Sequence, residues 1–289
     1  MQLKQALARA VAELTSNHVP SPRMNAELLL MFTLSCDRAY LYAHPERDLV
    51  EEEAFRYRSA LCERERGVPA QYITGHQEFW GMDLVVSPAV LIPRPETEHL
   101  VEKVLHLATG EQGLAQSTSQ ASLRIADVGT GSGCIALALA RELPNTEIHA
   151  TDISSTALEI ARANAARLQL NDRIEFHRTD LLEGLGGGFD FVVSNPPYVG
   201  QSEEDQVQLE VRKFEPRDAV FAGPVGTEVI ERLIQQAEPA LRSRGWLIFE
   251  ISGTIADKVR NLLKDWEAVE IISDLQSIPR VVQARKPLE

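Results

Sequence analysis

From residue 123 onward the sequence alternates between short apolar runs and longer amphipathic segments, which predict strands and helices respectively. We expect strands at 123–128, 146–151, 173–177, 189–194 and 245–251, and helices at 133–143, 155–169, 227–241 and 254–264. Such alternation is typical of a parallel sheet with helices on both faces. Two further runs, 267–273 and 279–285, are joined by a short loop and predict an antiparallel edge. The sequence therefore predicts an α/β fold.

The part of the chain before this alternation has a different pattern. Residues 1–73 carry apolar residues at helical spacing and no convincing strand, which predicts an all-α helical bundle. Residues 78–86 then suggest a hairpin, and a helix is expected from about Pro95 to Thr109. The stretch from Thr109 to Ser122 is rich in Gly, Ser, Thr and Gln and predicts a surface loop. We expect a helical domain over 1–73, a hairpin and linker over 74–95, and the sheet domain over 96–289.

Charge and composition exclude several classes of function. The 289-residue chain has a formal net charge of −13, which argues against wrapping a long nucleic acid by neutralising its phosphates. We find neither a membrane-span pattern nor the apolar core of a signal peptide. The widely spaced Cys36, Cys62 and Cys134 fit reduced thiols in a cytoplasmic protein. No histidine has the spacing of metal ligands, so no metal site is expected.

A glycine-rich loop follows the first expected strand of the sheet. Residues 123–128 lead into Gly129-Thr130-Gly131-Ser132-Gly133 and then into a helix. Alternate glycines let the backbone approach a ligand closely at the carboxyl end of the strand. The spacing is G-x-G-x-G, and Cys134 stands where the dinucleotide fingerprint has its third glycine. Taken alone, such a loop also fits an ordinary tight turn from strand to helix.

Two aspartates follow later strands at the corresponding edge of the sheet. Asp152 ends the second strand, where a carboxylate can accept hydrogen bonds from both hydroxyls of a ribose. Asp180, with Leu181 after it, closes the third strand region, where it can reach an adenine amino group. Each aspartate alone is also a good helix cap or turn former. Together with the glycine loop, the two favour a cofactor that contains a nucleoside.

The tetrapeptide Asn195-Pro196-Pro197-Tyr198 directly follows the fourth strand. Its prolines fix the backbone and remove N–H donors, so the loop offers carbonyl oxygens without competing donors. Asn195 adds a side-chain acceptor, and Tyr198 adds a flat ring with a polar tip. The Asn195 oxygen and the Pro196 carbonyl can accept from both N–H groups of a planar NH2 group, with Tyr198 packed over the plane. The alternative for the tetrapeptide alone is a strand-ending turn.

The order of these motifs resembles the class I S-adenosylmethionine-dependent methyltransferases. The resemblance implies a Rossmann-like, seven-stranded, mostly parallel sheet with an antiparallel C-terminal edge. It implies S-adenosyl-L-methionine as the cofactor, held by Gly129 to Gly133, Asp152, Asp180 or Leu181, and Asn195. In that fold the acidic residue two positions before the first glycine, here Asp127, often lies near the methionine part of the cofactor.

Over nearly its whole length the chain resembles one branch of this superfamily, the release factor glutamine methyltransferases (the PrmC/HemK family). The motifs that carry this resemblance are Tyr72-Ile73-Thr74-Gly75, Glu78-Phe79-Trp80-Gly81, Leu91 to Glu98, Asp127 to Gly133, Ser194 to Tyr198, Glu215-Pro216-Arg217 and Phe221-Ala222-Gly223. The resemblance implies methylation of N5 of the glutamine in the Gly-Gly-Gln motif of class 1 peptide chain release factors. It implies that Asn195, Pro196 and Tyr198 are catalytic, that Asn195 to Tyr198 bind the substrate amide, and that the helical domain helps to grip the release factor.

Departures from the family pattern are few, and two other functions compete. Ser252 and Ser277 stand where glycine is common, which puts the geometry of two loops in doubt. An N-methyltransferase that acts on an exocyclic amine of a DNA or RNA base is the main alternative, but it predicts a basic recognition surface. A non-catalytic cofactor-binding scaffold is opposed by the complete Asn-Pro-Pro-Tyr motif. We expect a monomer without membrane or direct nucleic-acid partners.

Overall fold

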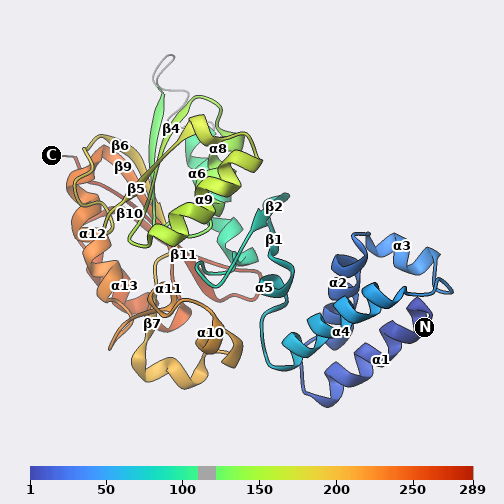
Figure 1. Ribbon diagram of the computed structural model, residues 1–289. Coiled ribbons are helices and arrows are strands. Elements are labelled where there is room, and N and C mark those ends of the chain that lie inside the picture. Colours follow the sequence, from blue (N-terminus) through green and yellow to red (C-terminus); the bar gives the residue numbers. More distant parts are fainter. Residues whose placement is uncertain (110–121, 289) are drawn as a thin grey trace. The chain divides into compact units, whose positions relative to one another are not determined.

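A computed structural model describes residues 1–109 and 122–288 of the chain (Figure 1). These residues form two compact units, one from Met1–His76 with Gln208–Phe214 and the other from Gln77–Val207 with Glu215–Glu289. The surface loop expected between Thr109 and Ser122 lies almost wholly outside the described residues. The expected limits of the domains stay predictions.

The first unit is helical, as the sequence predicts. Its helices are α1 (Leu3–Ser16), α2 (Pro22–Leu34), α3 (Arg38–Ala43), α4 (Glu51–Glu65), α5 (Ala70–Thr74) and, from much later in the chain, α10 (Leu209–Phe214). Apolar side chains of α1 and α2, among them Leu14, Leu29 and Leu30, are fully buried in its core. Asp37 caps α3 by accepting a hydrogen bond from the Tyr40 amide at 2.8 Å.

Arg64 holds α10 within the helical unit. Its guanidinium is buried and donates to the Asn25 side chain at 2.7 Å, to the Val68 carbonyl at 3.1 Å and to Glu210 of α10 at 2.5 Å. A buried guanidinium is stable only when its donors are paired, and here each nitrogen has a partner. The chain therefore leaves the second unit after Val207, returns to the helical unit, and re-enters the second unit at Glu215.

The second unit is built on a seven-stranded sheet with the order β10-β11-β9-β6-β3-β4-β5. Its strands are β3 (Leu123–Val128), β4 (Thr146–Asp152), β5 (Ile174–Arg178), β6 (Phe189–Ser194), β9 (Leu241–Glu250), β10 (Glu267–Ser273) and β11 (Pro279–Arg285). β9, β6, β3, β4 and β5 pair in parallel, whereas β11 pairs antiparallel with β9 and β10. The predicted α/β fold with an antiparallel C-terminal edge is confirmed, although β9 begins at Leu241, upstream of the expected residue 245.

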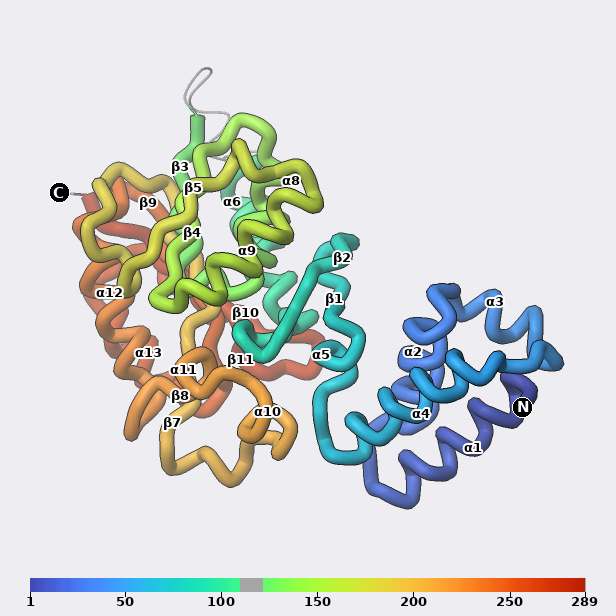
Figure 2. Tube along the Cα trace, in the orientation of Figure 1, coloured from blue at the N-terminus to red at the C-terminus, as the bar shows by residue number. Residues whose placement is uncertain are grey.

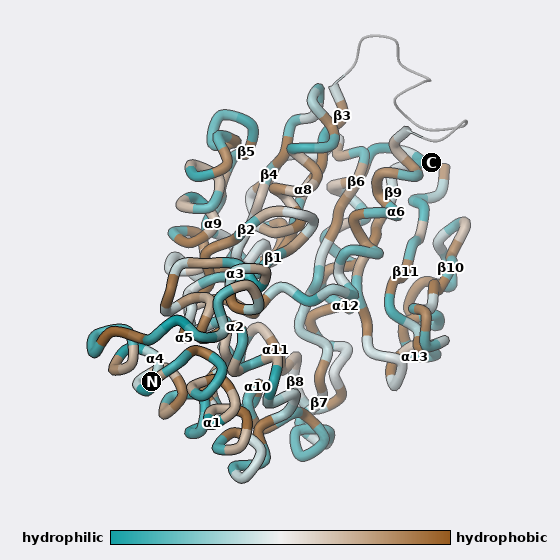
Figure 3. Tube along the Cα trace, turned by 90° about the vertical axis from the view of Figure 1, so that its right-hand side faces the viewer, coloured by the Kyte–Doolittle hydropathy of each residue, from teal (hydrophilic) through white to brown (hydrophobic). Residues whose placement is uncertain are grey.

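Helices cover both faces of this sheet (Figure 1). The helices of the second unit are α6 (Glu98–Thr109), α8 (Cys134–Glu142), α9 (Ser155–Arg167), α11 (Arg217–Val220), α12 (Glu228–Ala240) and α13 (Ala256–Leu262), with 3-10 turns at Pro95–Thr97, Asn171–Arg173, Gln201–Gln206 and Gly253–Ile255. Apolar residues of α6 and α8 join the core on one face, and those of α12 and α13 join the core on the other. Figure 3 shows the apolar stretches in β6, β9 and α8. Within residues 1–109 and 122–288, no helix is both long and apolar enough to cross a membrane.

Two small sheets complete the architecture. β1 (His76–Phe79) and β2 (Met82–Val85) form the predicted hairpin, and β7 (Val199–Gly200) pairs in parallel with β8 (Phe221–Gly223), which the sequence did not predict. Phe79, Met82 and Leu84 of the hairpin are buried in the same core as α6 and α8. Figure 2 shows β2 beside α9, with which it is in contact.

Asn164 of α9 joins this hairpin to the glycine-rich loop. Its side chain is fully buried, accepts from the Val85 amide at 2.7 Å, and donates to the carbonyls of Val85 at 3.0 Å and Ser132 at 2.9 Å. The amide thereby provides a side-chain partner for two backbone groups of β2 and one of the glycine-rich loop. Asn164 therefore links the end of β2 to the loop after β3 through its side-chain hydrogen bonds.

We expect Asn164→Ala to destabilise the second unit by about 2–4 kcal/mol, because buried backbone groups lose their partners. The exposed Asn171, whose side chain donates to Asp172, provides the control Asn171→Ala, with an expected change below about 0.5 kcal/mol. Urea unfolding followed by tryptophan fluorescence reports on this unit alone, since Trp80, Trp246 and Trp266 all belong to it. Equal midpoints for the two variants would contradict the role of Asn164.

Candidate active site

A cavity of about 440 Å³ lies in the second unit, where the loops that follow β3, β4, β5 and β6 meet. Of the residues predicted from the sequence, those that line it are Gly129, Thr130, Gly131, Ser132, Asp152, Asp180, Leu181, Asn195 and Pro197. Gly133, Pro196 and Tyr198 were predicted with them but do not line it. The carboxyl ends of adjacent parallel strands are where open α/β sheets bind ligands.

The glycine loop has a backbone that only glycine adopts easily. Gly129 and Gly131 have φ values of +71° and +56°, in the left-handed region. The Thr130 amide donates to the Thr151 carbonyl at 2.9 Å, which holds the loop against β4. Gly133 has another function, because a Cβ there would lie 3.3 Å from the Cβ of Ala161 in α9. Gly133 thus allows close packing of α8 on α9, and it does not face the cavity.

Asp127 stabilises this loop through hydrogen bonds of its buried side chain. The residue is fully buried, and its Oδ2 accepts from the Thr130 hydroxyl at 2.6 Å and from the Ala136 amide at 3.1 Å. Burial raises the pKa of Asp127 to about 7, although both hydrogen bonds act to lower it. Its Oδ1 is buried without a hydrogen-bond partner among the described residues. Asp127 ties β3, the loop and α8 together and does not itself line the cavity.

The carboxylate of Asp152 is held in a fixed orientation by backbone amides. Gly131 donates to Oδ2 at 2.9 Å, and Ser154 donates to Oδ1 at 2.8 Å. Burial raises the pKa of Asp152, and these amide donors oppose the rise. Each carboxylate oxygen can accept more than one hydrogen bond, so both remain able to accept from a hydroxyl pair. Asp152 therefore presents oriented acceptors at the wall of the cavity.

Asp180 forms an ion pair that the sequence did not predict. Arg232 of α12 lies 2.6 Å from its Oδ2, and both residues line the cavity. The pair leaves Oδ1 of Asp180 as the acceptor for a ligand. Leu181, the next residue, has a φ of +53° and supplies an apolar surface beside this carboxylate. One polar and one apolar group thus stand side by side, as a purine ring with an amino group requires.

A chain of hydrogen bonds fixes the orientation of the Asn195 side chain. Asn195 donates from Nδ2 to the Thr97 hydroxyl at 3.0 Å, and Thr97 donates to Oε2 of Glu250 at 2.6 Å. The Thr97 hydroxyl thus donates a hydrogen bond to the Glu250 carboxylate and accepts one from Asn195. The amino end of Asn195 is thereby used, and its Oδ1 is left as an acceptor. Asn195 lines the cavity.

Tyr198 is attached to the same carboxylate. Its hydroxyl donates to Oε1 of Glu250 at 3.0 Å, and its ring packs against the core formed by α12 and α13. Burial, followed by the negative charge of Glu250, raises the pKa of Tyr198. Burial also raises the pKa of Glu250. Tyr198 is therefore a neutral phenol that helps to hold Glu250 and fixes the position of the loop after β6.

The two proline-containing segments near the cavity are held together by Glu215. This buried carboxylate accepts from the Ile92 amide at 3.1 Å and from the Arg94 guanidinium at 2.5 Å. Arg94 on one segment and Pro216 on the other both line the cavity. The ion pair thus joins two walls of the cavity that are far apart in the sequence.

Five of these side chains were not predicted as site residues: Arg94, Thr97, Glu215, Arg232 and Glu250. Arg94, Thr97 and Glu215 lie within motifs that carry the family resemblance, so the sequence marked these positions but did not indicate what the three side chains do. Glu250 ends the strand β9 and Arg232 lies inside the helix α12, and neither has a local pattern that marks a site.

Comparisons with known proteins identify the family. The PrmC N-terminal domain matches residues 5–75, and the methyltransferase small domain matches residues 106–213. The release factor glutamine methyltransferase of Koribacter versatilis is 52% identical over 289 residues, which cover 99% of each chain. This chain belongs to the release factor glutamine methyltransferase family. The family member of Rhodopirellula baltica is 39% identical over 271 residues, which cover 92% of this chain and 90% of that relative.

The fold is shared with more distant methyltransferases. The catalytic domain of hMettl16 aligns with a TM-score of 0.56 at 19% identity, over 80% of this chain and 81% of that one. At this identity the likeness concerns the fold alone. The predicted fold class and family are both confirmed, and the protein is a methyltransferase.

We expect Thr97→Val to lower the rate of methyl transfer about tenfold or more, which is about 1.4 kcal/mol in the barrier. The valine keeps the shape but not the hydroxyl, so the Asn195 amide loses the acceptor that sets its orientation. Thr254→Val is the control, because the exposed Thr254 is near Ser252 and outside this network. Initial rates at saturating substrates test the prediction, and a rate within twofold of the wild type in a folded Thr97→Val protein would contradict it.

Proposed function

We propose that this protein methylates N5 of the glutamine in the Gly-Gly-Gln motif of class 1 peptide chain release factors. The methyl donor is S-adenosyl-L-methionine, and the products are N5-methylglutamine and S-adenosyl-L-homocysteine. Family membership over the full length supports the choice of substrate. The observation that carries the mechanism is the Glu250–Thr97–Asn195 chain, which leaves an oriented amide oxygen at the wall of the cavity.

The residues around the cavity fit the proposed cofactor. Oriented carboxylate oxygens at Asp152 suit the ribose hydroxyls, and Asp180 with Leu181 suits the adenine. The backbone of Gly129 to Ser132 and the Asn195 side chain would hold the remainder. Gly133 acts by packing α8 against α9. When bound, the cofactor supplies a methyl group on a sulfonium sulfur, which is already activated for transfer.

The protein's part in the reaction is to orient a poor nucleophile. The lone pair of an amide nitrogen is delocalised, so the glutamine nitrogen must be positioned and its electron density raised. In our proposal the Oδ1 of Asn195, at the wall of the cavity, and the carbonyl of Pro196, the next residue in the chain, accept from the two N–H groups of the substrate amide, which must extend past that wall to reach Pro196. As the nitrogen gains its methyl group, it loses one of these protons, which passes to solvent water. Tyr198, fixed by Glu250, shields the loop from water.

The release factor is also the partner proposed for the helical unit. Glutamine side chains are common, so the choice of one glutamine must depend on contacts beyond the amide. The helical unit has its own core and includes α10, which directly precedes the Glu215 segment of the cavity wall. We infer that this unit binds the body of the release factor while the cavity binds its glutamine.

The substrate is tested with labelled cofactor and purified release factor. We expect label to enter a wild-type class 1 release factor and not the same factor with its Gly-Gly-Gln glutamine replaced. DNA and RNA serve as further acceptors in the same assay and should remain unlabelled. Label in the replaced release factor would disprove the glutamine target, and label in a nucleic acid would favour the base methyltransferase.

Asn195→Ala should reduce turnover below detection and leave much of the cofactor binding in place. The substitution removes one acceptor for the amide, whereas Asp152, Asp180 and the glycine loop remain. Asn145→Ala, at an exposed position, is the matched control. Single-turnover rates and equilibrium binding of the cofactor separate the two effects. Near-normal turnover in Asn195→Ala would refute the role given to this residue.

A further inference from the structure

One face of the sheet is polar at the strands β4 and β5. The core beneath α12 and α13 contains residues of β3, β6, β9 and β11, but none from the described residues of β4 or β5. The connection from β5 to β6, residues 179–188, contains turns and no helix, so it leaves this end of the face without helical cover (Figure 2). The other face of the same two strands contributes Ile148, Ala150 and Ile174 to the core with α8. The polar face therefore requires an explanation of its own.

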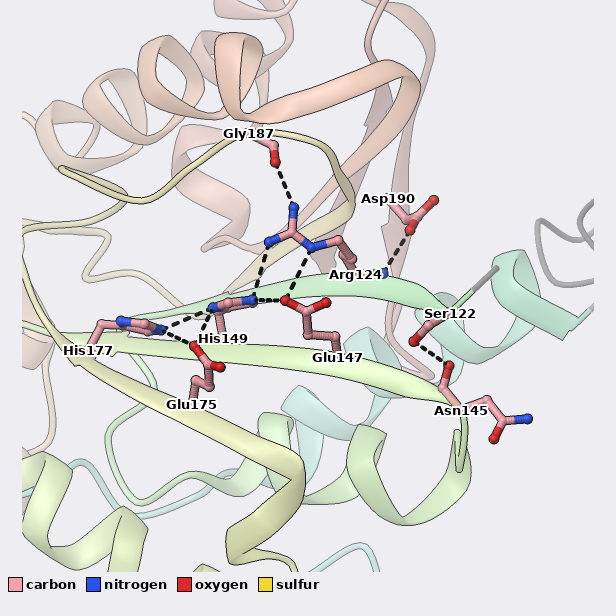
Figure 4. Close-up of polar contacts among 9 residues, drawn as sticks. All are labelled: Ser122, Arg124, Asn145, Glu147, His149, Glu175, His177, Gly187 and Asp190. Atoms are coloured by element: carbon pink, nitrogen blue, oxygen red, sulfur yellow. Dashed lines mark hydrogen bonds and ion pairs between the residues drawn. The ribbon is translucent and has the colours of Figure 1, made fainter. Parts of the chain in front are cut away.

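Three potential metal ligands converge on this face (Figure 4). Nδ1 of His149 lies 3.0 Å from Nε2 of His177 and 3.5 Å from Oε2 of Glu175, and the last two atoms are 3.6 Å apart. His149 lies on β4, opposite Glu175 on β5, and Thr151 lies opposite His177. Residues two apart on a strand share a face, so the register itself brings the three side chains together.

The separations between the ligand atoms match those of a tetrahedral metal centre. Zinc binds histidine nitrogen and carboxylate oxygen at about 2.0–2.1 Å, which places neighbouring ligand atoms roughly 3.3 Å apart in a tetrahedron. We propose that His149, Glu175 and His177 bind a divalent transition-metal ion of the zinc type, and that Glu147 orients His149. Two histidines and one carboxylate leave one coordination position for water.

Glu147 lies where it favours the tautomer of His149 that metal binding requires. Its Oε1 lies 2.7 Å from Nε2 of His149 and 3.3 Å from Nε of Arg124. A carboxylate accepts the Nε2 proton, so the lone pair of His149 is on Nδ1, which faces His177 and Glu175. Carboxylates that hold a metal-bound histidine in this way are common in zinc sites. Nη2 of Arg124 also lies 3.4 Å from Nε2 of His149, on the side of the ring away from the proposed ion.

The position of Glu175 favours a metal over a simple contact between the two histidines. A hydrogen bond between the two imidazoles would by itself explain their 3.0 Å contact. It does not require an oxygen of Glu175 within 3.6 Å of both nitrogens, on a side chain that is otherwise two-thirds exposed.

The site is structural in kind and independent of the proposed methyl transfer. None of His149, Glu175 and His177 lines the cavity. The ion would join the edge strand β5 to β4, just before the turn that carries Thr179 and Asp180 into the cavity wall. We therefore expect the metal to stabilise the edge of the sheet.

Metal binding is tested on the full-length, tag-free chain after treatment with a chelator. Calorimetric titration with Zn²⁺ should give one tight site per chain, and Zn²⁺ should raise the melting temperature. Co²⁺ should give the strong visible absorption of a four-coordinate site. We expect His177→Gln and Glu175→Gln to lose at least roughly tenfold in Zn²⁺ affinity, and Glu147→Gln to lose roughly 10–100-fold. His106→Gln, at an exposed position, should bind as the wild type does.

His177 and Glu175 are chosen because they are more exposed than His149 and can be replaced with less risk to folding. Absence of saturable Zn²⁺ binding in the wild type would overturn the proposal. So would wild-type affinity and stoichiometry in both His177→Gln and Glu175→Gln, since the metal would then bind elsewhere, for example at a cysteine. Either result would leave the methyltransferase activity, measured separately, unaffected.

Discussion

The candidate active site depends on the buried carboxylate of Glu250. It accepts hydrogen bonds from Thr97 and from Tyr198. Thr97 ends the 3-10 turn before α6, and Tyr198 lies in the loop after β6. Removing an anion from water is unfavourable, and the raised pKa of Glu250 reflects that cost. Two hydroxyl donors and the positive charge of Arg280 offset part of it. In return, one carboxylate fixes the positions of two segments, those of Thr97 and Tyr198, which are far apart in the sequence.

The carboxylate of Glu250 also determines which groups donate and which accept in this hydrogen-bond network. The two ends of an asparagine amide have nearly the same shape, so only hydrogen bonding decides which end faces a ligand. Because Glu250 can only accept while it is ionised, Thr97 must donate to it and must accept from Asn195. A hydroxyl without this carboxylate could turn and donate to Asn195, which would reverse the amide. The orientation that our proposed mechanism needs is thus set two hydrogen bonds away from the cavity.

Local patterns were enough to predict the sheet and the loops around the cavity. β6, β10 and β11 begin and end at the predicted residues, and in β6 this follows from a largely apolar run that is buried along its whole length. The glycine pattern predicted the loop after β3, but it could not separate Gly131, which lines the cavity, from Gly133, which packs against Ala161. Both need the same backbone freedom. The return of α10 to the helical unit had no local signal, since it depends on Glu210 meeting Arg64 across the fold.

The histidine cluster shows why spacing rules missed a candidate metal site. Such rules describe ligands on one helix or one turn, whereas His149 and His177 are 28 positions apart on neighbouring parallel strands. The length of the crossover through α9 sets that separation, so no fixed spacing can be expected. The useful signal is instead the parity of strand positions, which puts Glu175 and His177 on one face of β5 and His149 opposite them. That face lacks helical cover because the connection after β5 is short, and the same connection brings Asp180 to the cavity. An ion that fixed β5 at this point would therefore act on the strand from which the cavity wall begins.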